Sequence, residues 1–499
     1  MFDQHTDRLD PERALRRAGD SPRIPGNTVT LLRDGPNVFA SWLADIARAK
    51  HFILFENYIF RADRIGQKIS DALCERALAG VEVFVLFDWV GSLGTSRSLW
   101  VKMQRAGVRV RAFGTLRWSD PLLLLKRNHR KVVCIDGQIG HVGGLCVGDP
   151  WAGHPERGLS PWRDTAVRFE GPAAAELSRT FDETWSEAGS PLPARIREPE
   201  DVLARGTEVP PAAELSEDQP CCHVPLRIVS GLPGRSRIYR ITQVLLANAS
   251  SSIFITDAYF LTPPSMYEAL TAAARDGVDV RILVPGRSDI PWIAWASRAG
   301  YIGLLEAGVR IFEWQGPMLH AKTTVVDGEW CRVGSSNLNL ASLLTNWELD
   351  VVIEDATFGR VAEAMFLHDL SQSRELHLRK RRSSSSLNTA RSDKEQLVPA
   401  PSQKALPSPK VAVSGRTGAA VVRASAAVLG VALRRRYERS AWSVSIVAAI
   451  TLLSFGTLGF LLPQVVGFLI GGLCLWFGVG SLLRGIADFR LNRRRKNRR

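Results

Sequence analysis

Two kinds of hydrophobic pattern alternate along residues 26–373. Short runs of Val, Ile, Leu and Phe, such as residues 52–55, are bounded by turn residues and predict buried strands. Ala-rich stretches with helical spacing end at Gly-Val pairs, as in residues 77–81, and a strand-like run follows directly. Alternation of this kind is typical of βαβ units, so we predict an α/β fold.

The pattern occurs twice, because segments of the first half resemble segments that follow in the same order in the second. The matching pairs are 43–60 with 245–261, 77–88 with 273–285, 103–113 with 304–314, and 129–136 with 320–327. A repeat of roughly 190 residues indicates an internal duplication. We therefore predict two pseudo-symmetric α/β sandwich halves, at 26–195 and 223–373, joined by a linker at 196–222. Duplicated halves commonly face each other across a pseudo-two-fold axis, so a shared site should lie at their interface.

Two long apolar runs near the C-terminus contain no charged side chain. Residues 442–462 and 465–483 are each long enough to cross a hydrocarbon core of ~30 Å at a rise of ~1.5 Å per residue. Only Pro463 and Gln464 separate them, which predicts a transmembrane helical hairpin within 434–499. A buried helical pair in a soluble domain is the alternative. Basic flanks at both ends predict a multi-pass protein of the inner membrane with its body on the cytoplasmic side.

Charge is distributed unevenly along the chain. The formal net charge is +14, yet residues 374–499 hold 23 Lys/Arg and 5 Asp/Glu, against 41 and 45 in the preceding residues. Binding of nucleic acid usually requires a basic face, so we expect no nucleic-acid partner for the acidic body. Residues 374–433 are rich in Ser, Pro and basic side chains and predict a flexible linker. Residues 1–25 lack the apolar core of a signal peptide and predict a disordered N-terminus.

The seven cysteines form no CxxC pair and show no zinc-ligand spacing, which fits a reducing compartment. Cys134 and Cys331 fall in apolar runs and are expected to be buried free thiols. Cys221, Cys222 and His223 are a conceivable metal group, but adjacent cysteines rarely chelate one ion well. We therefore predict no metal site and no cofactor.

The same polar motif, His-x-Lys-x4-Asp, occurs once in each half, at 129–136 and 320–327. In an extended strand, side chains two residues apart point to the same face, so an imidazole and an ammonium group share one pocket. Where the halves meet, two ammonium groups could hold the oxygens of a phosphodiester. One imidazole could then attack phosphorus while the other acts as acid and base. The candidate catalytic residues are His129, Lys131, Asp136, His320, Lys322 and Asp327.

The two motif aspartates are expected to act differently from the histidines and lysines. Asp136 and Asp327 each precede a glycine at the end of a predicted strand, so they should fix turn geometry or pair with a local cation. A lone histidine in a strand is more often a core residue than a catalyst. Its occurrence twice, at the same place in a duplication, argues against that alternative here.

Each reactive histidine needs a carboxylate to set its tautomer and orientation. Asp164 lies 35 residues after His129, and we expect it to orient that histidine. Glu348 lies 28 residues after His320 and is the corresponding candidate in the second half. A solvated acid at a strand edge is the alternative for both.

These residues resemble the phospholipase D superfamily, whose signature is His-x-Lys-x4-Asp-x6-Gly-Gly/Ser-x-Asn, once per half. The resemblance covers most of residues 27–372 and is strongest to bacterial cardiolipin synthases of the phospholipase D type. It rests on residues 56–66, 127–137, 161–173, 257–270 and 334–353. It implies two phospholipase D-like halves around one site and metal-independent transfer through a phosphohistidine. It also implies that His129 is the nucleophile and His320 the acid and base.

The resemblance implies a set of supporting residues as well. They are Asp164, Glu348, Asn337, Ser335, Gly144 and Cys146. Asn337 and Ser335 match positions that contact the phosphate in this superfamily. Cys146 stands where the superfamily pattern has asparagine, and a thiol is a weak donor, which weakens the contact expected there.

Four functions fit the pattern to different degrees. Phosphatidyl transfer to an alcohol such as phosphatidylglycerol, with cardiolipin as product, agrees best with a membrane-tethered body. The alternatives are hydrolysis to phosphatidic acid, phosphodiester cleavage of nucleic acid, and an inactive lipid-binding scaffold. The acidic body argues against the nuclease, and two intact His/Lys pairs argue against the scaffold. Phospholipid substrates and the lipid bilayer are the expected partners. The apolar segments 118–126 and 289–295 could enter the bilayer interface or pack in the core.

Overall fold

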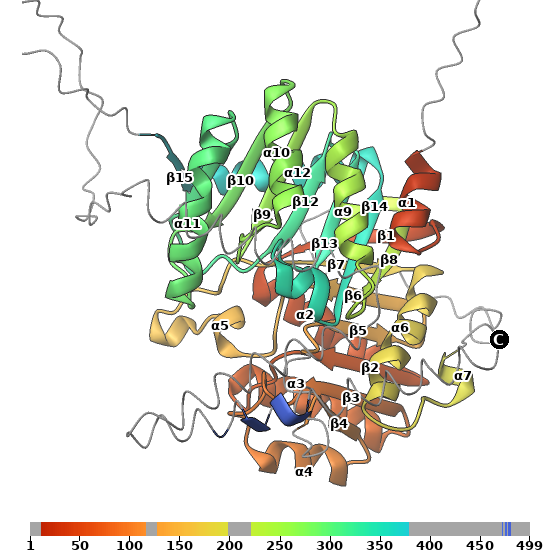
Figure 1. Cartoon of the computed structure of the whole chain (residues 1–499). Helices are drawn as coiled ribbons and strands as arrows, with labels where there is room; N and C mark the ends of the chain where they lie inside the picture. Colours follow the sequence, from red (N-terminus) through yellow and green to blue (C-terminus); the bar gives the residue numbers. More distant parts are fainter. Residues whose placement is uncertain are drawn as a thin grey trace, which may run out of the picture.

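The computed structural model describes residues 11–115, 127–197 and 221–378, together with 472, 475, 476 and 478–480. Within these residues one 15-stranded sheet runs through both halves of the chain (Figure 1). The strand order is β15-β11-β10-β9-β12-β13-β14-β8-β1-β7-β6-β5-β2-β3-β4. Strands β1 and β8 pair antiparallel near its middle, so the predicted duplication is confirmed and its halves meet edge to edge.

The first half contributes the strands from β1 to β4 in that order. Their bounds are β1 Ile24–Arg33, β2 Phe52–Asn57, β3 Glu82–Asp88, β4 Arg109–Phe113, β5 Val132–Ile135, β6 Ile139–Gly143 and β7 Thr165–Glu170. Strands β2, β3 and β4 are parallel, and the helices α3 and α4 connect them as predicted for βαβ units. The helices of this half are α2 Asp34–Arg48, α3 Arg64–Leu78, α4 Arg97–Arg105, α5 Asp149–Ala152, the 3-10 turn η2 Pro155–Arg157, α6 Ala173–Glu187 and α7 Ala194–Arg197.

The second half repeats this arrangement. Its strands are β8 Cys221–Gly231, β9 Ser252–Asp257, β10 Asp279–Pro285, β11 Arg310–Trp314, β12 Lys322–Val326, β13 Trp330–Gly334, β14 Glu348–Glu354 and β15 Ser373–Leu376. Here β9, β10 and β11 are the parallel strands. The helices are α9 Arg237–Asn248, α10 Pro264–Arg275, α11 Pro291–Glu306, the π-helical turn η3 Ala341–Thr345 and α12 Ala356–Ser371. In each half the three parallel strands therefore end at one edge of the sheet.

Helices cover both faces of the sheet. On one face, α6 and α12 pack over a single apolar core that runs through both halves. On the other face, α2, α3 and α4 cover the first half, while α9, α10 and α11 cover the second, each with its own core. Val132 and Cys134 of β5 lie in the shared core, and Val133 and Ile135 lie in the opposite one. Burial on both faces explains why this strand reads as a continuous apolar run.

Part of residues 1–25 is folded, so the prediction of a disordered N-terminus is wrong for that part. Helix α1, Pro11–Gly19, packs on the second half, and Leu15 and Ala18 are buried in the core beneath α9. Because α1 is short and rich in arginine, its amphipathic spacing is hard to recognise in the sequence. It nevertheless has one narrow apolar face that a neighbouring helix can cover. At the other end, β15 pairs with β11, so the sheet extends slightly into the linker predicted at 374–433.

The predicted transmembrane spans, 442–462 and 465–483, lie outside the described residues apart from a few helical positions near 472–480. Among the helices that the structure does describe, none combines the length and the apolar character needed to span a bilayer. The apolar segment 118–126 also lies outside the described residues.

Candidate active site

Both His-x-Lys motifs lie where the parallel strands end. Strand β5 runs antiparallel to β2, and its first residue, Val132, pairs with Glu56 near the carboxyl end of β2. In the second half, Lys322 begins β12 and pairs with Asp257, the last residue of β9. The histidines therefore precede the strands instead of lying inside them. This edge of an open α/β sheet is where ligands usually bind.

The two motifs are joined by crossed contacts between the halves. His129 Nδ1 lies 3.0 Å from Glu348 Oε2, and His320 Nδ1 lies 2.7 Å from Asp164 Oδ2. Each carboxylate thus comes from the half that does not supply its histidine. The expectation that Asp164 orients His129 is wrong. Because the halves pack edge to edge, the start of β5 lies beside Glu348 of the second half, and the start of β12 lies beside Asp164 of the first.

Backbone hydrogen bonds hold this crossing in place. His129 N donates to Trp347 O at 2.8 Å, and His320 N donates to Arg163 O at 2.7 Å. Trp347 and Arg163 immediately precede the two carboxylates, so one short segment holds each histidine by both backbone and side chain. Arg163 is itself buried and pairs with Asp369 at 2.7 Å.

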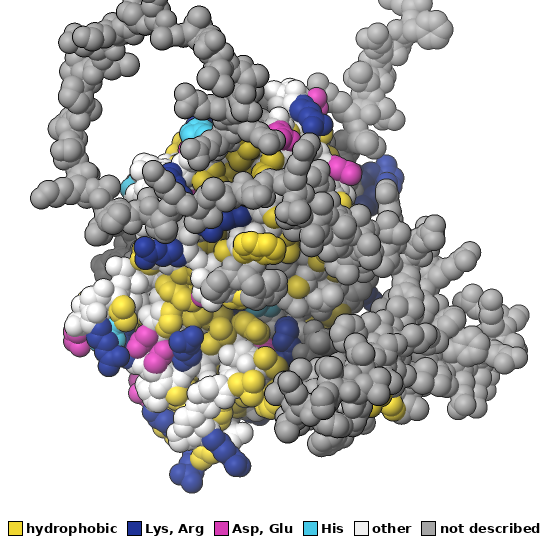
Figure 2. Space-filling view, turned by 60° about the vertical axis from the view of Figure 1, so that its left-hand side comes forward, with side chains coloured by type: hydrophobic (Ala, Val, Ile, Leu, Met, Phe, Trp, Pro, Cys, Tyr) yellow, Lys and Arg dark blue, Asp and Glu magenta, His cyan; other side chains and the backbone are white. Residues whose placement is uncertain are grey.

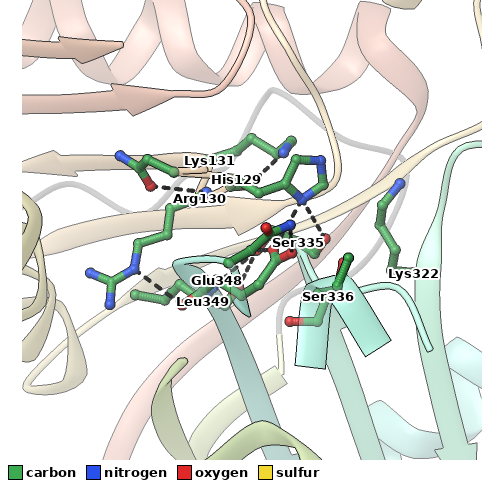
Figure 3. A network of polar contacts seen from close by, with 12 residues as sticks. His129, Arg130, Lys131, Lys322, Ser335, Ser336, Glu348 and Leu349 are labelled. Atoms are coloured by element: carbon green, nitrogen blue, oxygen red, sulfur yellow. Dashed lines mark hydrogen bonds and ion pairs between the residues drawn. The ribbon is translucent and has the colours of Figure 1, made fainter. Parts of the chain in front are cut away.

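The contacts at Nδ1 select one tautomer for each histidine. At His129, Glu348 Oε2 and the Ser335 carbonyl oxygen, 3.1 Å away, both accept, so Nδ1 carries the proton (Figure 3). At His320, Asp164 Oδ2 accepts in the same way at 2.7 Å, a closer contact than that of the Trp151 Nε1–H group, 3.4 Å from the same Nδ1 atom. A neutral ring then presents the lone pair of Nε2, the atom suited to nucleophilic attack or proton transfer.

Both motif lysines are buried close to the histidines. Lys131 and Lys322 are 1% and 0% exposed, and the Nζ atom of each donates to the backbone oxygen of the histidine in its own motif. Figure 3 shows the two side chains approaching His129 from different halves. Burial lowers the pKa of Lys322 to about 8, and the nearby charge of Lys131 adds to the shift while Asp164 opposes it. Two neighbouring buried cations favour an anionic ligand between them.

Burial also shifts the pKa values of the histidines and their carboxylates. It lowers the pKa of His320 to about 4, with Lys322 adding to the shift and Asp164 opposing it. Burial lowers the pKa of His129 too, against the opposing effect of Glu348. Burial alone would raise the pKa of each carboxyl group, but the adjacent histidine and lysine charges outweigh it and lower the pKa of both. The lowered pKa values therefore favour neutral imidazoles beside carboxylates.

The second half supplies polar groups around its motif. Ser335 Oγ donates to Glu348 Oε2 at 2.5 Å, which braces the carboxylate that holds His129. Asn337 is 3% exposed, and in the described part of the chain its Oδ1 atom has no hydrogen-bond partner. Buried polar atoms are nearly always paired, so an unpaired amide oxygen here points to a ligand position.

The first half has smaller and less polar residues at the same places. Gly144 corresponds to Ser335, and a Cβ atom at Gly144 would lie 2.2 Å from Asp164 Oδ1, so no side chain fits. Cys146 corresponds to Asn337 and is buried, and burial raises the pKa of its thiol. This half therefore offers a neutral, weak donor where its twin offers an amide.

The motif aspartates lie away from the histidines and hold turns. Asp136 accepts hydrogen bonds from the backbone N–H groups of residues 50–52 at 2.7–2.8 Å. Asp327 accepts three equivalent bonds from residues 250–252 at 2.8 Å. Both adopt φ values of 52° and 54°, in the left-handed region. Each ties the end of its motif strand to the start of β2 or β9, which agrees with a turn role rather than a catalytic one.

Four aromatic residues around the histidines were not predicted. Tyr58 lies edge-on to His129 at 4.8 Å between ring centroids, and Tyr259 lies edge-on to His320 at 6.0 Å. Trp151 and Trp162 also pack on His320, at 5.5 and 5.8 Å. The tyrosines occupy the same place in the repeated segments ENYIF and DAYFL, and that match was the available signal. The two tryptophans have no counterpart in the second half that could have revealed them.

Within 11–115, 127–197 and 221–378, no group of three or more His, Cys, Asp or Glu side chains is arranged to hold a metal ion. Cys134 and Cys331 are buried free thiols, as their apolar surroundings predicted. Cys222, from the conceivable metal group, is exposed.

Comparisons with known proteins agree with this arrangement. The family model described as cardiolipin synthase, PLD-like domain, matches residues 42–185 and 243–370, one segment in each half. The chain is 34% identical to cardiolipin synthase A of Pseudomonas putida over 370 residues, 73% of this chain and 72% of that protein. It is also 34% identical to cardiolipin synthase A of Pseudomonas aeruginosa (strain LESB58) over 373 residues, 74% and 72% of the two chains.

A solved structure shares the fold. The crystal structure of phosphatidylserine synthase from Haemophilus influenzae Rd KW20 superposes with a TM-score of 0.55 at 15% sequence identity, covering 73% of this chain and 92% of that one. At this low identity the likeness concerns the duplicated architecture only.

Proposed function

Because the chain belongs to the family of phospholipase D-like cardiolipin synthases, we propose that it transfers a phosphatidyl group through a phosphohistidine to an alcohol such as phosphatidylglycerol. The observation that carries this proposal is the pair of crossed histidine–carboxylate contacts beside two buried lysines. Such a set holds one nucleophile and one acid–base group around a single phosphodiester.

The first step cleaves the donor lipid. His129 Nε2 attacks phosphorus, a P–N bond forms, and the P–O bond to the head-group alcohol breaks. His320, which is protonated when the anionic lipid is bound, gives its Nε2 proton to the departing alkoxide, which leaves as glycerol when phosphatidylglycerol is the donor. Attack through Nε2 makes the His129 ring cationic, and Glu348, 3.0 Å from Nδ1, stabilises that charge.

The second step reverses this chemistry on another alcohol. His320 Nε2 accepts the proton of the acceptor hydroxyl, whose oxygen attacks phosphorus as the P–N bond breaks. With phosphatidylglycerol as acceptor, the product is cardiolipin and His129 is regenerated. Burial lowers the pKa of His320 to about 4, and an anionic phosphodiester beside Lys322 would raise it toward the range in which His320 can donate a proton.

Fixed positive charge stabilises the transition state in this proposal. Lys131 and Lys322 face the phosphate oxygens, and the side-chain N–H group of the buried Asn337 donates a further hydrogen bond to them. The chain's own residues thus supply the charge stabilisation, and we propose that no cofactor is required.

We further propose that a C-terminal helical hairpin at 442–462 and 465–483 anchors the enzyme. The uncharged runs are long enough to span a bilayer, and the basic residues at both ends support a catalytic body on the cytoplasmic side. Cysteine accessibility mapping at the turn, residues 463–464, tests this topology. Labelling from the periplasmic side is expected, and labelling only from the cytoplasmic side would contradict it.

The transfer reaction can be tested with membranes from expressing cells. Labelled phosphatidylglycerol should yield cardiolipin and glycerol, with or without a chelator, and His129→Ala should abolish both products. Phosphatidic acid as the sole lipid product would contradict transfer and indicate hydrolysis instead. Cleavage of DNA with inert lipid would contradict lipid chemistry altogether.

A further inference from the structure

Three large apolar side chains are exposed on segments next to the histidines. Leu93 is 61% exposed in the loop between β3 and α4, and Leu159 is 58% exposed after α5. Trp295 is 65% exposed in the second turn of α11. Exposed side chains of this size cost free energy in water, and when grouped they usually mark an interaction surface. Trp295, in the apolar segment 289–295, is therefore not a core residue.

Two of these segments touch the tyrosines that cover the histidines. In the β3–α4 loop, Ser92 Oγ donates to Tyr58 O at 3.3 Å, one residue before Leu93. Just ahead of α11, Asp289 Oδ1 accepts from the Tyr259 hydroxyl at 2.8 Å. The β3–α4 and β10–α11 connections are equivalent in the two halves, so their apolar residues flank the shared site on both sides of the pseudo-two-fold axis.

The third segment touches the tryptophans that pack on His320. Trp162 N donates to Pro150 O at 2.9 Å, which closes the loop that carries Leu159. Helices α5 and α11 lie on the same side of the molecule in Figure 1. Figure 2 brings this side forward and shows apolar side chains gathered across its middle, with basic side chains around them.

An exposed arginine accompanies each of the three apolar residues. Arg97 follows Leu93 closely, Arg157 precedes Leu159, and Arg287 lies in the β10–α11 connection, ahead of the helix that carries Trp295. Arginines around an apolar rim favour an anionic lipid surface, which attracts basic side chains that lie close to it. Tryptophan is also enriched at the head-group level of membranes.

We propose that Leu93, Leu159 and Trp295 form a docking rim that inserts into the surface of an anionic bilayer. The rim places the opening of the site against the lipid head groups, so a donor lipid reaches the histidines without fully leaving the leaflet. This role rests on the proposed transferase function and adds a second membrane contact, separate from the C-terminal hairpin.

The rim can be tested by comparing one lipid in two physical states. The full-length chain is reconstituted into vesicles of equal phosphatidylglycerol and phosphatidylcholine, alongside the variant Leu93→Ser/Leu159→Ser/Trp295→Ser. We expect the variant to lose about tenfold or more in turnover of bilayer phosphatidylglycerol, equivalent to about 1.4 kcal/mol. Its turnover of short-chain phosphatidylglycerol, supplied as dissolved monomers, should match the unmodified chain.

Leu78→Ser provides the matched control. Leu78 is 76% exposed but lies at the end of α3, before β3 begins, at the opposite edge of the sheet. This variant should behave like the unmodified chain on both substrates. An equal loss on bilayer and monomeric substrate in the rim variant, or no loss on either, would overturn the proposal.

A second measurement does not depend on turnover. Hydrogen exchange of residues 89–96, 155–162 and 289–296 should slow when phosphatidylglycerol replaces phosphatidylcholine in the vesicles, and the rim variant should lose that protection. If the chain transfers no phosphatidyl group, this protection still reports docking, so the two proposals fail independently. Identical exchange in both lipids would contradict the docking rim.

Discussion

Replacing Glu348 by glutamine tests the crossed pairing most sharply. The carboxylate lies 3.0 Å from His129 Nδ1, is fully buried and accepts a second bond from Ser335 Oγ. A hydrogen bond to a charged group contributes about 1.5–3 kcal/mol, and glutamine keeps the shape but removes the charge. If that stabilisation is realised on the cationic phosphohistidine, the rate should fall about 10- to 150-fold.

The assay compares two leaving groups. A phosphatidyl ester of p-nitrophenol needs no acid to expel its leaving group, whereas phosphatidylglycerol does. With His129 as nucleophile, Glu348→Gln should slow both substrates to a similar degree. Asp164→Asn, which removes the partner of His320, should slow phosphatidylglycerol strongly and the activated ester much less.

Comparison with histidine variants shows which carboxylate acts with which histidine, and this holds whether His129 or His320 is the nucleophile. The structure predicts that Glu348→Gln follows the leaving-group pattern of His129→Gln, and that Asp164→Asn follows that of His320→Gln. The opposite grouping would refute the crossed arrangement. Thermal unfolding of all four variants provides the control, because a loss of folded protein would lower the turnover rates of both substrates alike.

Three further outcomes follow from the site. The pKa of Lys322 is lowered to about 8, so kcat/KM should fall as pH rises through that value, and Lys322→Arg should remove this alkaline limb in a pH–rate profile. Gly144→Ala should reduce kcat about tenfold or more without unfolding the protein, because the new Cβ displaces Asp164, and single-turnover kinetics will show it. Asp327→Ala should lower Tm while leaving kcat unchanged. The folded-state pKa of Asp327 lies below its ordinary value, so its stabilisation is complete above that ordinary value and is lost as pH falls through the folded pKa; a Tm measured across acidic pH checks this.

The duplication and the chemistry of the motifs could be predicted from the sequence, because both are visible in short segments of the chain. The repeated His-x-Lys spacing identified the four groups that converge, and the Asp-Gly pairs predicted the turns that Asp136 and Asp327 hold. The α/β alternation predicted the parallel strands that end at the site. Each of these features depends on residues a few positions apart.

Features that depend on how the halves meet could not be read from the sequence. Asp164 is nearer to His129 along the chain, yet it holds His320, because β1 and β8 join the halves into one sheet. The covering role of Trp151 depends in the same way on packing across the interface. Helix α1 was missed because its short apolar face becomes meaningful only against α9.

Trapping the intermediate tests the central claim most directly. His320→Gln slows the second step, and a phosphatidyl ester of p-nitrophenol needs no acid in the first, so this variant should be quenched in alkali after mixing with that labelled ester and analysed by peptide mass spectrometry. The account predicts a phosphatidyl adduct on His129 that is stable to alkali, labile to acid and absent from His129→Ala. An adduct on a residue outside the two motifs, or turnover in His129→Ala at the unmodified rate, would contradict it.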